Sequence, residues 1–165
     1  MKISELKNEL EKIEVLKHEL DSLVCSHEKI IILGNGGSNS IASHISQDYT
    51  KALGKKAITF TDPSRLTCYI NDYGMESAYR VFIEEFATKE TLVILISSSG
   101  NSMNIVNAAM HCNENDIKTA TLSGFDKENK LNKITSELNY WVNSTDYGVV
   151  ECAHLIFLHS IIKYL

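Results

Sequence analysis

The sequence predicts an α/β fold: a single-domain, three-layer α-β-α sandwich around a five-stranded parallel sheet. The chain has 165 residues, the length of one domain with one core. Short continuous apolar runs alternate with segments of helical periodicity, as in parallel sheets covered by helices. Hydrophobic residues make up 44% of the chain and charged residues 22%, which is typical of a packed domain.

Each expected element follows from its own residue pattern. Residues 3–24 repeat leucine or isoleucine every three or four positions, which predicts a helix with a narrow apolar stripe typical of helix–helix association. Continuous apolar runs predict strands at 29–33, 56–60, 91–97, 117–123 and 138–142. Helical spacing, with Ser38 as a capping residue, predicts further helices at 38–51, 76–87, 103–112 and 148–164.

Charge and composition exclude several functional classes. The net charge is −5 and the lysines are scattered, which argues against a nucleic-acid surface. No apolar run approaches the ~18–20 residues that a membrane span needs, and the first twenty residues are too charged for a signal peptide. The four cysteines, which are widely spaced, favour free thiols in a reducing cytoplasm.

Two small-residue turns follow predicted strands, "GNGGS" at 34–38 and "SSSGNS" at 97–102. Ligands of parallel sheets bind at the carboxyl ends of strands. Neither turn has the spacing of a dinucleotide fingerprint or a Walker loop, so no nucleotide cofactor is expected. The glycines allow close backbone approach and the serines suit a phosphate ester, although either turn alone also fits an ordinary strand-to-helix connection.

Two helices carry histidine and acid on one face each. His44 and Asp48 are four residues apart, and Glu151 and His159 fall on one stripe of the last helix. Two imidazoles and two carboxylates make a chemically sensible zinc shell. From the residues alone, His159 also fits a core histidine, and Glu151 also fits a first-turn partner of the helix dipole.

The chain resembles the SIS (sugar isomerase) domain family, and within it the phosphoheptose isomerases. The matching stretches are "GNGGSNSIASHISQD", "SRLTCYINDYG", "LVILISSSGNSMNIVNAA" and "ECAHLIFLHSII". The resemblance implies a flavodoxin-like SIS domain at 29–165 after an N-terminal helical segment at 1–28 that serves oligomerisation. It also implies a homo-oligomer, a tetramer or a dimer, with sites built across subunit interfaces.

The resemblance assigns roles to residues of this chain. The substrate-binding set it implies is Asn35, Gly36, Gly37, Ser38, Asn71, Asp72, Ser97, Ser98, Ser99 and Ser102, with the four serines of the second turn on the phosphate. The metal set, for a divalent ion such as zinc, is His44, Asp48, Glu151 and His159. The catalytic set is Asp48 or Glu151 as base and His159 as acid.

The implied reaction is the isomerisation of sedoheptulose 7-phosphate to glycero-manno-heptose 7-phosphate through an enediol, in surface polysaccharide synthesis. Three positions depart from the family pattern: Asp48 stands where glutamate is usual, Glu151 where glutamine is usual, and Gly148 where aspartate is frequent. These departures keep two alternatives open. One is an isomerase of a different phosphosugar, and the other is a non-catalytic SIS protein that binds a phosphosugar or another protein.

Overall fold

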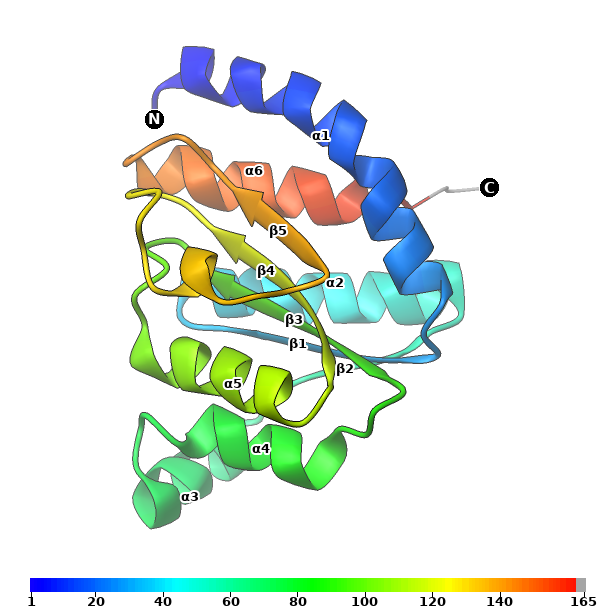
Figure 1. The fold of residues 1–165 in the computed structure, drawn as a ribbon, viewed down its shortest axis with the longest axis vertical. Coiled ribbons are helices and arrows are strands. Elements are labelled where there is room, and N and C mark those ends of the chain that lie inside the picture. Colours follow the sequence, from blue (N-terminus) through cyan, green and yellow to red (C-terminus); the bar gives the residue numbers. More distant parts are fainter. Residues whose placement is uncertain (163–165) are drawn as a thin grey trace.

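The computed structural model describes residues 1–162 and consists of a parallel sheet between two layers of helices (Figure 1). The strand order is β2-β1-β3-β4-β5, and every neighbouring pair is parallel. The strands are β1 Lys29–Gly34, β2 Lys56–Thr59, β3 Thr91–Ser97, β4 Lys118–Ser123 and β5 Leu138–Trp141. The predicted five-stranded parallel α-β-α sandwich is therefore confirmed.

Helices cover both faces of the sheet: α1, α2 and α6 lie on one side, and α3, α4 and α5 on the other (Figure 1). Their bounds are α1 Ile3–Cys25, α2 Gly37–Leu53, α3 Pro63–Tyr73, α4 Ala78–Phe86, α5 Met103–Glu114 and α6 Tyr147–His159, with a 3-10 turn, η1, at Leu131–Lys133. None of these helices has the length and apolar character needed to cross a bilayer, within residues 1–162.

Strand β1 shows how the sheet divides the core. Ile30 and Ile32 face the cluster under α1, α2 and α6, whereas Ile31 and Leu33 face the cluster under α3, α4 and α5. All four side chains are fully buried. A strand buried on both faces has no polar face to present, which is why it reads as a continuous apolar run.

Three local predictions are corrected. Ser38 is not the N-cap of its helix, because α2 begins at Gly37 with Gly36 as its cap. Helix α3 was not expected, although Asp62 caps it by accepting a hydrogen bond from the Arg65 amide at 2.8 Å and Pro63 opens it. The last helix ends at His159, short of the predicted 164, and residues 163 and 164 lie outside the described part of the chain.

The apolar stripe of α1 packs largely within the chain. Ile13 and Leu20 are buried, and Leu6, Leu16 and Leu23 pack against the same cluster. Ile3 and Leu10 of the stripe remain exposed. The helix therefore contributes to the core that α6 and the sheet share, and the boundary at residue 28 stays a prediction.

The strand order places the candidate site. After β1 the chain turns to β2 on one side of β1, and β3 then pairs on the other side. The loops that follow β1 and β3 therefore diverge at the point where the strand order reverses. Such a point leaves a crevice at the carboxyl ends of the strands, where ligands of open α/β sheets bind.

Candidate active site

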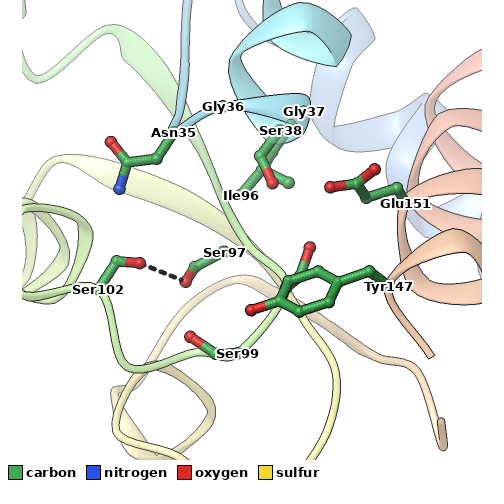
Figure 2. A pocket seen from close by; sticks show the side chains of 11 residues that line it. Asn35, Gly36, Gly37, Ser38, Ile96, Ser97, Ser99, Ser102, Tyr147 and Glu151 are labelled. Carbon is green, nitrogen blue, oxygen red and sulfur yellow. Dashed lines mark hydrogen bonds between the residues drawn. The ribbon is translucent and has the colours of Figure 1, made fainter. Parts of the chain in front are cut away.

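The predicted glycine and serine turns meet in one cavity of about 250 Å³. It is lined by Asn35, Gly36, Gly37, Ser38, Ile96, Ser97, Ser98, Ser99, Ser102, Tyr147 and Glu151, most of which Figure 2 shows around a common space. No lysine or arginine is in the lining. An anion in this cavity would thus be held by hydroxyl groups, backbone amides and helix N-termini.

The glycine turn brings backbone into the cavity. Gly36 has φ of 51°, a conformation that side chains rarely adopt, and it directs the chain from β1 into α2. The turn is anchored from behind by the Tyr79 hydroxyl, which donates to the Gly34 carbonyl at 2.7 Å. Burial raises the pKa of Tyr79 to about 12, so the phenol remains a neutral donor.

The serine turn supplies hydroxyl groups. Ser97 Oγ donates to Ser102 Oγ at 3.3 Å, the dashed line in Figure 2. Ser98 is 6% exposed, and its Oγ is buried with no hydrogen-bond partner. A buried hydroxyl without a partner costs free energy, so a native structure that retains one calls for an explanation. Because Ser98 lines the cavity, a bound phosphate oxygen would satisfy it.

A pair of side-chain amides joins the two turns. Asn35 Nδ2 donates to Asn104 Oδ1 and Asn104 Nδ2 donates to Asn35 Oδ1, both at 2.9 Å. Asn104 is 5% exposed and lies in the first turn of α5, directly after the serine turn. The double hydrogen bond fixes Asn35 at the cavity wall. Sequence reasoning missed Asn104, whose only signal is an amide beside a ligand-binding turn.

Helix α6 contributes the opposite wall through Tyr147 and Glu151. The Glu151 carboxylate lies against Gly37, so close that a Cβ at position 37 would stand 2.4 Å from Oε1. No ion pair or hydrogen bond to the Glu151 side chain occurs among residues 1–162. Tyr147, also missed from the sequence, is 59% exposed and packs edge-on against Phe125 at a ring separation of 4.8 Å. Its only signal was its place four residues before Glu151.

Three of the four predicted metal ligands come together farther along the same helices. Asp48 Oδ2 lies 3.4 Å from His44 Nε2 and 3.2 Å from His159 Nε2. One ligand atom from each residue lies within 4.8 Å of the others. Zinc with nitrogen and oxygen ligands at ~2.0–2.2 Å in a tetrahedron has ligand atoms about 3.3 Å apart. The donor set and its spacing therefore fit zinc, and the cluster is a possible divalent-metal site.

Glu151 does not join this cluster within the chain. It precedes His159 by eight residues, which on an α-helix is about 12 Å of rise, beyond the reach of a carboxylate. Asn71 and Asp72 also lie away from the cavity lining. They are exposed on α3, where Asn71 Nδ2 donates to Asp72 Oδ1 at 2.8 Å. One chain thus brings together the glycine turn, the serine turn and Glu151, and separately His44, Asp48 and His159.

The neighbouring histidine of α6, His154, has a structural role. It is fully buried, and its Nε2 lies 3.1 Å from the Ser123 carbonyl, where the neutral ring donates. Burial lowers its pKa to about 4, so the ring is neutral near pH 7. The prediction that His154 lies on a different face from His159 and is structural agrees with this position.

Comparison with known proteins identifies the family. A model of the SIS domain matches residues 2–124. The phosphoheptose isomerase of Fusobacterium nucleatum is 30% identical over 98% of this chain and 85% of its own length, and that of Helicobacter pylori is 35% identical over 93% and 84%. The structure of phosphoheptose isomerase GmhA from Neisseria gonorrhoeae superposes with a TM-score of 0.84 at 23% identity, covering 96% of this chain and 91% of that one. The chain belongs to the SIS domain family and, within it, to the phosphoheptose isomerases.

Proposed function

We propose that the protein converts sedoheptulose 7-phosphate to glycero-manno-heptose 7-phosphate through an enediol, in heptose or surface polysaccharide synthesis in the cytoplasm. The observation that carries the proposal is the cavity at the strand ends, where serine hydroxyls face the unpaired carboxylate of Glu151. An aldose–ketose isomerisation needs an anchor for the phosphate, a base near C1 and C2, and a group that stabilises the oxyanion.

The serine turn is the proposed phosphate anchor. Ser97, Ser98, Ser99 and Ser102 line the cavity in front of α5, a helix of 12 residues. The N-terminus of such a helix favours an anion through its free amides and its dipole. Ser98 has the strongest case, because its buried hydroxyl lacks a partner. Asn35, Gly36, Gly37 and Ser38 would contact the sugar hydroxyls on the other wall.

Glu151 is the proposed base. Its carboxylate reaches the cavity from α6, and the lining contains no cation that would hold it away from a substrate proton. It would remove a proton from C1 or C2 and return it to the neighbouring carbon. A positioned base of this kind typically contributes about 10²–10⁴ in rate.

His44, Asp48 and His159 are the proposed holders of zinc. The Asp48 carboxylate oxygen lies between the two imidazole nitrogens, at 3.4 and 3.2 Å, which orients all three ligands before a metal arrives. When bound there, zinc would polarise a substrate carbonyl as a Lewis acid. Without a metal, the same Asp48–His159 hydrogen bond is an acid–base pair, the other role expected from the sequence.

We propose that a second copy of the chain brings these two halves together. Within one chain, helix geometry keeps Glu151 about two turns from the metal ligands. His44 is 52% exposed and His159 33% exposed at the side chain, so both are accessible to another subunit. Exposed Ile3 and Val15 on α1 offer apolar surface for the same assembly, a dimer or a tetramer.

Hybrid oligomers test this arrangement. His159→Ala and Glu151→Ala should each lower turnover at least ~10²-fold as separate proteins. When the two are co-expressed, a randomly mixed two-fold dimer regains one intact site in half of its molecules, about a quarter of wild-type activity. Absence of recovery would show that each site is built within one chain.

The reaction itself is tested by incubating the protein with sedoheptulose 7-phosphate, with and without added zinc. Conversion that a chelator abolishes and zinc restores supports the proposal. Saturable binding without conversion would instead support a non-catalytic phosphosugar-binding protein. If neither occurs, parallel incubations with other ketose phosphates test the alternative substrate that Asp48, Glu151 and Gly148 keep open.

A further inference from the structure

A second hollow, of about 690 Å³, lies along β5 at the edge of the sheet. Its lining includes Lys12, Lys127 and Lys133 around Trp141, and no aspartate or glutamate. The chain as a whole carries a net charge of −5, so a hollow with only positive side chains departs from the general surface. It shares no lining residue with the cavity of the candidate active site.

The lysines concentrate more positive charge than the neighbouring acids balance. Lys133 pairs with Glu128 at 3.2 Å, and Lys12 lies 3.8 Å from Glu9. Glu9 is 6% exposed and also accepts hydrogen bonds from the Tyr140 hydroxyl and the Asn143 amide. Lys127 has no ion pair among residues 1–162.

The positive groups converge on the only tryptophan of the chain. The Nζ atoms of Lys12 and Lys127 lie 5.5 and 5.9 Å from the centre of the Trp141 ring. Burial, and to a lesser extent the charge of Lys127, lower the pKa of Lys12. An anion placed between these lysines would offset both effects. The indole N–H of Trp141 is also buried without a hydrogen-bond partner.

The hollow is connected to the serine turn by direct hydrogen bonds. The segment 126–133, which carries Lys127 and Lys133, donates from the Leu131 amide to the Gly100 carbonyl at 2.9 Å and from the Lys130 amide to Asn101 Oδ1 at 3.2 Å. Asn129 of this segment lies directly against Gly100, where a Cβ would stand 1.9 Å from its Oδ1. A ligand that orders this segment therefore acts on the turn that faces the candidate active site.

We propose that this hollow is a second anion site, which binds a small phosphate-bearing molecule and through segment 126–133 alters the serine turn. The ligand is either an inorganic polyphosphate or a phosphorylated metabolite, which share the chemistry that lysine recognises. The site would be an effector site, separate from the substrate cavity, and its existence does not depend on the proposed isomerase activity.

Equilibrium dialysis of the full chain with labelled pyrophosphate, at constant ionic strength, tests the site. The test variant is Lys127→Gln with Lys133→Gln, two exposed side chains outside the substrate cavity, and the matched control is Lys89→Gln on the opposite side of the sequence. Wild type and control should bind two pyrophosphates per chain, one in each cavity. The test variant should bind one, or bind the second at least ~10-fold more weakly, because two charge-assisted contacts are lost.

Two further measurements sharpen the result. Fluorescence of Trp141, the only tryptophan, should change with saturation in wild type and lose that change in the test variant. Pyrophosphate, or fructose 1,6-bisphosphate as the metabolite arm, should change KM in wild type but only compete with substrate in the variant. Equal dialysis curves for wild type and the test variant would overturn the proposal. Two-site binding in a protein without isomerase activity would refute the proposed reaction and leave this site standing.

Discussion

Replacing Gly37 by alanine should displace the Glu151 carboxylate without harming the fold. The three atoms nearest to a Cβ at position 37 all belong to that carboxylate, at 2.4, 2.7 and 2.8 Å. Because ordinary contact begins near ~3.5 Å, the carboxylate must retreat by about 1 Å. The obstacle is the end of a flexible side chain, so the backbone of α2 need not move.

The expected size of the effect follows from this displacement. Misplacing a catalytic group by about 1 Å can cost about 10² in rate. Gly37 lies in α2 without a positive φ, so alanine there should leave the free energy of unfolding unchanged or raise it by up to ~1 kcal/mol. The variant should therefore be at least as stable as wild type and about a hundredfold less active.

The assay is kcat/KM for sedoheptulose 7-phosphate, read beside denaturant unfolding. In the background of Glu151→Ala, the change at Gly37 should cause little further loss, because both substitutions act on one group. Gly54→Ala is the matched control: Gly54 ends the same helix with φ of 65° and open space around it. That control should lose about 1 kcal/mol of stability and keep its activity. A folded Gly37→Ala protein with wild-type kcat/KM would refute the role of Glu151.

Three other outcomes are expected. Ser98→Ala should raise KM at least ~10-fold through a lost phosphate contact and leave unfolding unaffected, as steady-state kinetics and urea titration would show. Asn104→Ala should lower kcat/KM about tenfold by releasing Asn35, whereas alanine at exposed Asn101 tests whether any nearby amide suffices. The depressed pKa of His154 means that the unfolded chain takes up its proton first, so stability should be complete above about pH 6.5 and fall towards pH 4. The difference between 6.5 and about 4 corresponds to on the order of 3 kcal/mol, and His154→Leu should remove that slope from acid unfolding curves.

The strands were predictable because burial on both faces leaves an unbroken apolar run. Strand β3 has the predicted bounds, and the others differ by one residue or so at an end. Helix α3 was missed because none of its residues is buried, so it lacks the apolar repeat that the prediction used. Its start signals, Asp62 and Pro63, were present.

The site was predictable where local spacing determines proximity. His44 and Asp48 are four residues apart on one helix, and they do lie together. Glu151 and His159 also share a helix face, but a shared face gives direction and not distance. Asn104 was missed because its partner, Asn35, is 69 residues away and belongs to another strand end. Such a pair depends on sheet order, which no local pattern contains.

Helices α2 and α6 explain why the functional residues form two groups. Both helices lie side by side and begin near the cavity at the strand ends (Figure 1). Gly37 in the first turn of α2 meets Glu151 near the start of α6, and Asp48 meets His159 farther along both. Two such helices repeat their contacts about every turn, so residues eight apart on α6 serve different places. Shortening glutamate to aspartate at position 48 moves the carboxylate closer to α2, where both imidazoles already contact it. The substitution is thus compatible with the cluster, and the fourth ligand must come from outside this helix pair.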